Sequence, residues 1–369
     1  MPDLYIGLMS GTSLDGVDGV LADFSPAAPL VISHAAVPFD DTLKAELLAL
    51  NTPGANELHR AALAGNALMR VYAQVVRELL LQSGAKAGSV QAIGAHGQTV
   101  RHQPQAFDGT GYTLQLCQPA LLAELTGIDV VADFRSRDVA AGGQGAPLAP
   151  FFHQALFGGR GETVGVLNIG GISNLTLLRA DGTMLGFDCG PGNALMDGWC
   201  ERHTGHPYDD QGAWAASGQV LPALLDAMAS DAYFARMPPK STGRDLFNMA
   251  WLEGHLQAFG AARPQDVQAT LAELTARACA LDATRLEPGL GHLIVCGGGA
   301  LNNHLMRRLG HWLPGAHVAS SADSGLPPLQ MEAAAFAWLA RKTVRREKLD
   351  LTSTTGAQGA RVLGAVYPA

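Results

Sequence analysis

A turn of small polar residues near the start of the chain carries two acids. The turn and the start of the next strand comprise Gly11, Thr12, Ser13, Leu14, Asp15, Gly16, Val17 and Asp18. Several backbone N–H groups of such a turn can converge on one point, which suits a phosphate. Carboxylates beside a phosphate are favourable when a divalent cation or its water shell lies between them. The turn therefore indicates a nucleotide with magnesium, although an ordinary glycine-rich hairpin explains the same residues.

Two later turns are also rich in glycine. Gly170 and Gly171 separate two apolar segments, and three consecutive glycines begin at Gly297, after the apolar segment 293–296. Glycine lets a ligand approach the backbone closely, and the helix predicted to follow adds positive potential. Because consecutive glycines cost conformational entropy, we expect Gly297 to Gly299 to contact a nucleotide. Gly170 and Gly171 alone are explained by an ordinary hairpin, but their pairing with the first turn favours a second phosphate site.

Asp188 is the candidate catalytic base. It follows the predicted strand 184–187 and precedes a Gly-Pro-Gly turn. A carboxylate at the C-terminal end of a strand, beside glycine, is suited to accept a proton. The structural alternative is an aspartate that caps a helix or a turn, which is the interpretation we prefer for Asp197.

A dense group of charges follows the apolar segment 130–132. It contains Asp133, Arg135, Arg137 and Asp138. An arginine at a strand end could hold a carboxylate through two hydrogen bonds. Substrate recognition is therefore a competitive explanation for this group beside a solvated loop.

Two further positions could bind a polar substrate. The His-Gly-Gln-Thr segment that ends at Thr99 follows another predicted strand and offers donors for sugar hydroxyls. Glu332 lies at the start of a predicted helix, where an acid either stabilises the first turn or binds substrate. The twelve histidines show no spacing typical of a zinc site.

Composition limits the class of protein. The chain has 369 residues, of which 47% are hydrophobic and 16% charged, enough for two or three domains with a large core. A net charge of -8 argues against a general nucleic-acid binder. The five cysteines form no Cys-x-x-Cys pair, which favours a reducing compartment. Without a signal-like N-terminus or a long apolar run, we expect a soluble cytoplasmic protein with no membrane partner.

Common catalytic motifs are absent from the sequence. It has no Gly-x-x-x-x-Gly-Lys-Ser/Thr loop, no Gly-x-Gly-x-x-Gly turn, no Gly-x-Ser-x-Gly elbow and no His-Glu-x-x-His helix. The common nucleoside triphosphatase, dinucleotide-binding, serine hydrolase and zinc protease classes are therefore excluded.

Hydrophobic periodicity and chain breakers predict the elements of the first half. Strands are expected at 5–9, 17–24, 30–38, 91–95, 113–116 and 130–132, and helices at 41–50, 57–83 and 119–126. Asn56 is expected to cap the second of these helices. The glycine-rich stretch 140–146 is a plausible domain boundary.

The second half repeats this organisation. Strands are expected at 163–169, 174–179, 184–187 and 292–296, and helices at 194–203, within 221–259, at 266–286 and at 329–347. Each half thus opens with a strand, a turn of small residues and further strands, and then alternates helices and strands. Two such hairpins facing across a cleft could hold a polyphosphate from both sides.

These motifs together carry a family resemblance. The most specific stretches are 9–18, 96–99, 133–138, 142–148, 187–193, 240–244 and 297–299. Over nearly the whole chain they resemble the anhydro-N-acetylmuramic acid kinases, within the superfamily of actin, sugar kinases and heat-shock ATPases. Cys189 is a departure from the family pattern, because we expect threonine there, and it should alter packing more than chemistry.

The resemblance implies an α/β fold of two duplicated actin- and hexokinase-like domains, each ribonuclease H-like, around a central cleft. Domain I would comprise 1–139 and 345–369, and domain II would comprise 140–344. Nucleotide binding would fall to the first turn and to Gly170, Gly171, Gly297, Gly298 and Gly299. Sugar binding would fall to Ser10, Thr99, Asp133, Arg135 and Glu332.

The implied activity is that of an ATP- and magnesium-dependent kinase of cell-wall recycling. It would convert 1,6-anhydro-N-acetylmuramic acid to N-acetylmuramic acid 6-phosphate. Asp188 would take a proton from water as that water attacks the anomeric carbon, and the bridging oxygen would receive the γ-phosphoryl group. Asp15 is the expected neighbour of magnesium, and the domains would close over the substrate.

The family resemblance also suggests a homodimer.

Other interpretations of the same residues remain open from the sequence. An ordinary sugar kinase of the same fold would use Asp188 to deprotonate a sugar hydroxyl instead of water. A non-catalytic, nucleotide-dependent switch or filament subunit would turn over ATP slowly without any sugar.

Overall fold

The protein is described by a computed structural model that covers residues 2–11, 13–26, 28–159, 161–243, 246–260 and 262–369. Two compact units divide the chain. Unit 1 comprises Met1–Phe152 and Gln330–Ala369, and unit 2 comprises His153–Leu329. These limits differ from the domain boundaries expected from the sequence, since unit 1 extends past residue 139 and also takes the segment 330–344.

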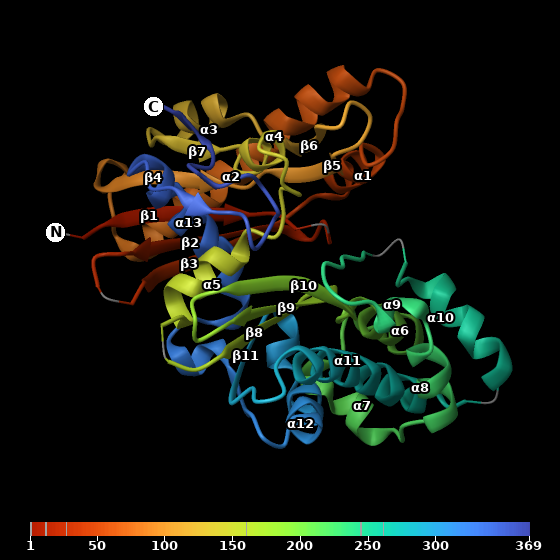
Figure 1. The fold of residues 1–369 in the computed structure, drawn as a ribbon. Helices are drawn as coiled ribbons and strands as arrows, with labels where there is room; N and C mark the ends of the chain where they lie inside the picture. Colours follow the sequence, from red (N-terminus) through yellow and green to blue (C-terminus); the bar gives the residue numbers. More distant parts are fainter. Residues whose placement is uncertain (1, 12, 27, 160, 244–245, 261) are drawn as a thin grey trace. The chain divides into compact units, whose positions relative to one another are not determined.

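Unit 1 is built on a six-stranded mixed sheet in the order β15-β7-β4-β1-β2-β3 (Figure 1). An antiparallel meander is formed by β1 (Leu4–Met9), β2 (Gly16–Asp23) and β3 (Leu30–Pro38). Parallel to β1 and then to each other run β4 (Val90–Ala95) and β7 (Val130–Ala132), and β15 (Ala365–Tyr367) pairs antiparallel with β7. A separate hairpin joins β5 (Gln98–Pro104) to β6 (Gly111–Leu116).

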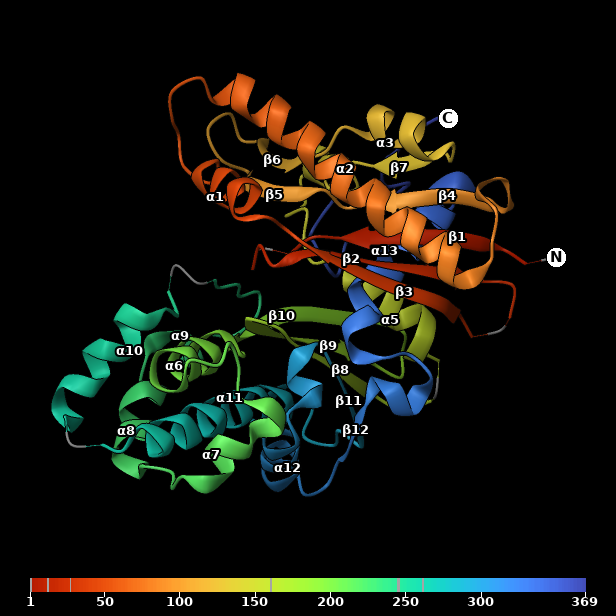
Figure 2. The same cartoon turned by 180° about the vertical axis from the view of Figure 1, so that it is seen from behind.

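Two long helices cover this sheet. α13 (Met331–Val344) packs on β1 and β4, and α2 (Glu57–Ser83) packs on β2 and β3, as the view from behind in Figure 2 shows for α2. Gly7 and Gly94 allow α13 to come close, because a methyl group there would lie 1.8 Å and 2.1 Å from backbone oxygens of the helix. This packing explains why α13 belongs to unit 1, although the sequence led us to expect it in domain II.

The start of α2 differs from the prediction. Asn56 stands at the expected N-cap position, but its φ is 52° and its side chain makes no capping hydrogen bond. A capping side chain reaches the first helical N–H groups from extended backbone, which the left-handed conformation of Asn56 does not provide. The other helices that begin in this unit are α1 (Asp41–Ala49), α3 (Pro119–Thr126), α4 (Ser136–Ala140) and α5 (Ala149–Phe157).

Unit 2 contains a five-stranded sheet with the same plan. Its order is β10 (Met184–Pro191), β9 (Ile172–Leu178), β8 (Val164–Ile169), β11 (His292–Cys296) and β12 (His317–Ser320). The first three strands are antiparallel, and β11 and β12 continue the sheet in parallel. This arrangement matches β3-β2-β1-β4-β7 of unit 1 strand for strand, which confirms the expected duplication and the ribonuclease H-like α/β fold.

The core of unit 2 lies between one face of its sheet and a layer of helices. Its apolar residues include Leu167, Leu175 and Phe187 from the strands and many side chains of α11 (Pro264–Leu286). The other helices are α6 (Ala194–Thr204), α7 (Ala213–Ser217), α8 (Pro222–Ala229), α9 (Ala232–Ala235), α10 (Met249–Leu256) and α12 (Asn303–Trp312). One face of the sheet is therefore covered by this helical layer.

Two further observations concern the environment of the chain. All five cysteines are free thiols, and four of them are buried. Within the described ranges, no helix is both long enough and apolar enough to cross a membrane.

Candidate active site

The sequence predicted Asp188 just after the end of a strand, but in the structure Asp188 lies inside one. β10 continues past it to Pro191, and the register with β9 shifts directly after Asp188, so that Cys189 forms a bulge. Bulges beside active sites redirect side chains. Phe187 and Cys189 belong to the core of unit 2, and Asp188 between them faces the opposite side of the sheet.

Two asparagines share this face with Asp188, and sequence reasoning missed both. Asn174 of β9 lies directly opposite Asp188, and Asn168 of β8 lies opposite Asn174. Opposed residues on adjacent antiparallel strands project to one face with Cβ atoms about 5 Å apart. The amide oxygen of Asn168 lies only 2.4 Å from where a methyl group on Gly297 would be. A polar row therefore runs from Asp188 to the triple-glycine turn.

The surroundings of Asp188 tune its acidity. The backbone N–H of Thr242 donates a hydrogen bond of 3.0 Å to Asp188 Oδ2. Burial raises the pKa of Asp188 to about 6, while the Thr242 bond and the charge of Lys240 act in the opposite direction. A carboxylate with this pKa is ionised at neutral pH and still basic enough to accept a proton, which suits a general base.

Lys240 neutralises another acid, although it lies near Asp188. Its Nζ is 2.7 Å from Asp282 Oδ2, and its side chain is only 1% exposed. The Nζ also lies 5.0 Å from the ring centre of Tyr233, whose hydroxyl donates to the backbone oxygen of Asp188 at 2.8 Å. Asp188 is therefore supported through its backbone, and the nearby cation is already paired.

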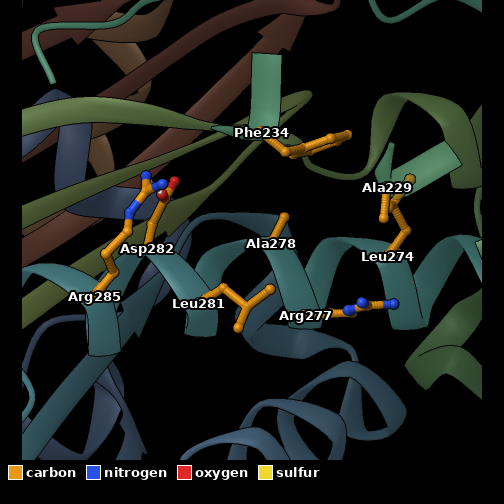
Figure 3. Close-up of a pocket in the computed structure, with 8 residues that line it drawn as sticks. All are labelled: Ala229, Phe234, Leu274, Arg277, Ala278, Leu281, Asp282 and Arg285. Atoms are coloured by element: carbon orange, nitrogen blue, oxygen red, sulfur yellow. Dashed lines mark hydrogen bonds and ion pairs between the residues drawn. The ribbon is translucent and has the colours of Figure 1, made fainter. Parts of the chain in front are cut away.

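A cavity of about 260 Å³ borders the same ion pair, and Figure 3 shows its walls. It is lined by Ala229, Phe234, Leu274, Arg277, Ala278, Leu281, Asp282 and Arg285. Asp282 and Arg285 lie close together at one end, joined by an ion pair of 2.6 Å, and most of the remaining wall is apolar. None of the residues predicted to bind substrate or nucleotide lies in this cavity.

The second glycine turn is fixed to the start of α6. The N–H of Asn193 donates to the oxygen of Gly170 at 2.7 Å, and the N–H of Gly192 donates to the oxygen of Gly171 at 3.0 Å. A methyl group at Gly192 would lie 2.3 Å from the Gly170 oxygen. The turn and the chain that follows Asp188 are thus held together as one structure.

The triple-glycine turn packs against this second turn. Gly297 has a φ of 74°, and Gly298 opens the short 3-10 helix Gly298–Leu301. A methyl group at Gly299 would lie 2.4 Å from the side chain of Ile169, at the end of β8. The structure therefore brings the two glycine turns expected to bind nucleotide in unit 2 to one place, beside the polar row.

The first glycine turn is held by one backbone and one side-chain hydrogen bond. The buried Leu14 has a φ of 59°, and its N–H donates to the oxygen of Gly11 at 3.2 Å. The amide of the buried Gln98 donates to the same oxygen at 3.1 Å. A methyl group at Gly16 would lie 2.3 Å from the oxygen of Val37, so glycine is required there.

The other residues of this turn differ in what they could offer a ligand. Thr12 lies outside the described residues. Leu14 and Val17 are buried in the core of unit 1, so that only their backbone groups could contact a nucleotide. Ser13 is partly exposed.

The two acids of the first turn point to different surroundings. The Asp15 side chain is 78% exposed, with Lys44 Nζ 3.9 Å away. Asp18 Oδ1 lies 3.4 Å from His34 Nε2, and the charge of Asp18 helps to raise the pKa of Glu332. Asp18 is therefore the acid on the side of the predicted sugar-binding residues, whereas Asp15 faces solvent.

Ser10 and Thr99 are held by neighbouring polar groups. The buried Ser10 hydroxyl lies 3.0 Å from the Tyr72 hydroxyl and donates to the oxygen of Gly97 at 3.1 Å. A contact of Ser10 with substrate would thus involve its backbone. Thr99 Oγ1 accepts a hydrogen bond of 3.3 Å from the amide of Gln115 on the neighbouring strand.

Arg135 is oriented by neutral groups. Its Nε and Nη2 lie 3.2 Å and 3.0 Å from His96 Nε2, and its Nη1 donates to the oxygen of Gly145 at 2.8 Å. Burial lowers the pKa of Arg135 to about 10, against the opposing effect of Glu332 and Asp138, so the guanidinium stays charged at neutral pH. No acid among the described residues lies within 4 Å of it as an ion-pair partner.

Glu332 and Asp133 complete the predicted sugar-binding set. Desolvation and the charge of Asp18 raise the pKa of Glu332, and Arg135 acts against them. Asp133 adopts a φ of 58°, which is unusual for a residue other than glycine. Its carboxylate accepts a bond of 3.4 Å from the N–H of Ser136. Arg135, Glu332 and Asp18 are electrostatic neighbours, whereas the Ser10 hydroxyl is engaged with Tyr72 and Gly97.

Comparison with known proteins places the chain in a family. The model of the family described as anhydro-N-acetylmuramic acid kinase matches residues 3–369. The chain belongs to the anhydro-N-acetylmuramic acid kinase family. Relatives with that name include one from Variovorax paradoxus, 65% identical over 100% of this chain and 99% of the relative, and one from Albidiferax ferrireducens, 61% identical over 100% of both.

Solved structures include more distant matches. An activator of 2-hydroxyisocaproyl-CoA dehydratase from Clostridium difficile with bound ADPNP has a TM-score of 0.47 and 11% identity, covering 93% of this chain and 97% of that chain. A ROK family glucokinase from Streptomyces griseus in complex with glucose and AMPPNP has a TM-score of 0.41 and 14% identity, covering 92% and 99%.

This anhydro-N-acetylmuramic acid kinase homologue departs from the expected pattern at Cys189. The thiol is fully buried in the core of unit 2, where burial and the neighbouring Cys279 hold its pKa well above the usual range. The side chain therefore packs behind Asp188 and offers no reactive thiolate.

Several residues that build the site of this kinase homologue were not found from the sequence. Lys240 and Thr242 lie in a stretch that carried the family resemblance, but their contacts with Asp282 and Asp188 join distant parts of the chain. His96 belongs to the segment expected to offer donors to sugar hydroxyls, and only the structure shows its Nε2 accepting a hydrogen bond from Arg135.

Proposed function

We propose that the protein is an ATP-dependent kinase that opens 1,6-anhydro-N-acetylmuramic acid with water and phosphorylates O6. Membership of the anhydro-N-acetylmuramic acid kinase family over residues 3–369 supports this proposal. The observation that carries it in the structure is Asp188, a half-buried carboxylate whose pKa is raised to about 6 and whose neighbouring cation is already paired.

The proposed reaction uses Asp188 as the general base. Asp188 removes a proton from water as the water oxygen bonds to the anomeric carbon, C1. The bond between C1 and the bridging oxygen breaks, and this oxygen stays on C6. It forms a bond to the γ-phosphorus of ATP as the bond to the β-phosphate oxygen breaks, and ADP leaves. A leaving oxygen captured in this way does not accumulate as a free alkoxide.

Arg135, with Glu332 nearby, would bind the sugar. A charged guanidinium without an ion-pair partner is suited to a carboxylate, and muramic acid sugars carry one on their lactyl group. Asp133 and Thr99 would add contacts to hydroxyl groups. Ser10 would contribute through its backbone, because its hydroxyl is already hydrogen-bonded inside unit 1.

The glycine turns would hold the nucleotide. Backbone groups of Gly11, Gly170 and the turn from Gly297 suit phosphates and the nucleoside, because none carries a side chain that would block approach. Among the described residues, no group of three or more His, Cys, Asp or Glu side chains forms a metal site. Magnesium bound to ATP keeps phosphate and water ligands and needs only one or two carboxylates, which Asp15 and Asp18 could supply. When bound, it would neutralise phosphate charge.

The same proposal includes the biological setting expected from the sequence. The substrate class belongs to bacterial cell-wall recycling, so we expect the enzyme to act in the cytoplasm. The family resemblance supports a homodimer, and the acidic net charge of -8 supports small-molecule ligands over nucleic acid.

A coupled ADP-release assay tests the proposal. We expect rapid ADP release with 1,6-anhydro-N-acetylmuramic acid and little with glucose, N-acetylglucosamine or other common sugars. Equal rates with a free hexose would favour an ordinary hydroxyl-directed kinase. ADP release that does not respond to any sugar would favour a nucleotide-dependent switch.

A further inference from the structure

His96 occupies the corner between β4 and β5, beside the predicted sugar-binding residues. Its side chain is almost fully buried, and its backbone N–H donates to the oxygen of Leu8 at 3.1 Å. Its ring lies against Phe336 of α13, with ring centres 4.7 Å apart. The backbone of His96 and one face of its imidazole are thus both held within unit 1.

The contact with Arg135 defines the protonation state of this ring. Arg135 Nε always carries a proton and donates to His96 Nε2 at 3.2 Å, so His96 Nε2 must be the unprotonated nitrogen. Burial and the charge of Arg135 lower the pKa of His96 to about 3. His96 is therefore a neutral hydrogen-bond acceptor at neutral pH.

A second acceptor fixes the other side of the guanidinium. The oxygen of Gly145 accepts from Arg135 Nη1 at 2.8 Å, and the N–H of Gly145 donates to Asp138 Oδ2 at 2.5 Å. The hydroxyl of Thr355 donates to the other oxygen of the buried Asp138, also at 2.5 Å. The buried Asp138 is therefore used to hold the loop that carries Gly145.

These contacts leave part of the guanidinium unused. An arginine has five N–H donors, and the contacts with His96 and Gly145 account for three of them. Both acceptors are neutral, so the positive charge is retained. A planar cation with two spare donors and a fixed orientation matches a carboxylate bound through two hydrogen bonds.

We propose that His96 is a positioning residue that presents Arg135 to a carboxylate of the substrate and thereby sets the preference for an acidic sugar over its neutral counterpart. This inference rests on the proposed function, because it assigns the carboxylate to the lactyl group of the anhydro sugar. It adds a role for a residue that does not itself contact the reacting atoms.

The test compares two substrates and two variants in steady-state kinetics. The substrates are 1,6-anhydro-N-acetylmuramic acid and 1,6-anhydro-N-acetylglucosamine, which lacks the lactyl carboxylate. His96→Phe keeps a ring against Phe336 but removes the acceptor, and His96→Gln keeps an acceptor. We expect His96→Phe to lower kcat/KM for the acidic sugar about 10- to 100-fold, mainly through KM. Activity with the neutral sugar and the KM for ATP should stay within about twofold of wild type.

His96→Gln should recover most of the lost activity with the acidic sugar. A double variant with Arg135→Ala should show no further loss beyond Arg135→Ala alone, because His96 acts through Arg135. Equal losses with both sugars, additive losses in the double variant, or an unchanged His96→Phe enzyme would overturn the inference. If His96→Phe does not fold, His96→Gln and the cycle with Arg135→Ala decide it.

Failure of the proposed function gives a different result. In that case the wild-type protein phosphorylates neither sugar, and calorimetric binding of the two sugars replaces kinetics. A preference of wild type for the acidic sugar that is lost in His96→Phe still supports the inference. Equal binding of both sugars, or binding of neither, contradicts it.

Discussion

Arg135 in unit 1 and Asp188 in unit 2 are both charged side chains without a direct ion-pair partner among the described residues, and the two units achieve this by different means. In unit 1 the cation Arg135 is hydrogen-bonded to neutral groups, and the buried Asp138 beside it is occupied by Gly145 and Thr355. In unit 2 the anion Asp188 accepts a backbone N–H, while Lys240 is paired with Asp282. Each functional charge is thus kept free of a direct opposite partner.

The two centres differ in the property that their surroundings control, which is the orientation of the side chain for Arg135 and the pKa for Asp188. Three hydrogen bonds fix the direction of the Arg135 guanidinium, which suits recognition of a planar anion. Asp188 is held mainly by its strand and bulge, and burial raises its pKa, which suits proton transfer. One centre is built for orientation and the other for basicity.

The largest expected effect comes from removing the base. Asp188→Asn should lower kcat by about 10³-fold or more while leaving ATP affinity within about threefold, because the amide cannot accept the proton. Stopped-flow or coupled ADP release and nucleotide titration measure the two quantities. Since burial raises the pKa of Asp188, its ionised form is disfavoured in the fold, and the variant should unfold at the same or a higher temperature at pH 8.

A matched control is Asp181→Asn, which changes an exposed aspartate of a turn in the same unit. It should retain full turnover. Near-normal activity of Asp188→Asn, or an equal loss in Asp181→Asn, would contradict the assignment of the base.

The next largest effect tests which carboxylate Lys240 mainly neutralises, that of Asp282 or that of Asp188. Lys240→Met should destabilise the protein by about 3 kcal/mol in urea unfolding, because it leaves Asp282 buried with only Arg285 as a partner. Combining it with Asp282→Asn should restore at least half of that loss. If the double variant is no more stable than Lys240→Met, neutralising Asp282 is not the role of Lys240.

Recognition in unit 1 should respond more weakly. Arg135→Ala should raise the KM for the anhydro sugar about 10- to 100-fold, equivalent to one or two charge-assisted hydrogen bonds, with the KM for ATP unchanged. Arg101→Ala provides a control, since Arg101 pairs with Glu57 in the same unit. Equal losses for sugar and ATP would remove Arg135 from the substrate site.

The smallest change is a displaced pH profile. Only ionised Asp188 accepts a proton, so kcat/KM should fall about tenfold for each pH unit below about 6 and level off above it. In Lys240→Met, loss of a nearby positive charge should move this limb to higher pH. A wild-type profile that is flat from pH 5 to 7, with the protein folded, would show that the group with this pKa is not the base.

The sequence was a good guide to elements with strong periodicity. α2 has the predicted bounds because 27 residues of helical pattern lie between clear breakers. The antiparallel meanders and the glycine turns were also predicted, since alternating apolar residues and clustered glycine reflect local geometry. Their positions after apolar strands made Asp188 the candidate base and Arg135 a candidate substrate ligand, and both roles stay predictions.

Features that depend on distant contacts could not be predicted. The Gly-Pro-Gly segment after Asp188 has the composition of a turn, but a bulge lets β10 continue into it as far as Pro191. The approach of α13 to Gly7 and Gly94 moves that helix into unit 1, and no local pattern reports it. The contacts of His96 with Arg135 and of Lys240 with Asp282 likewise appear only once the sheets have formed.

Oxygen labelling shows whether Asp188 activates water, which is the step that separates this reaction from ordinary sugar phosphorylation. The reaction is run in water enriched in ¹⁸O with the unlabelled anhydro sugar, and the product is examined by mass spectrometry and ¹³C NMR, with preformed product incubated in parallel to measure exchange at C1. We predict one ¹⁸O atom at C1, none at O6 or in the phosphate, and no labelled product from Asp188→Asn. Phosphorylated product without ¹⁸O at C1 would contradict the role of Asp188 in activating water.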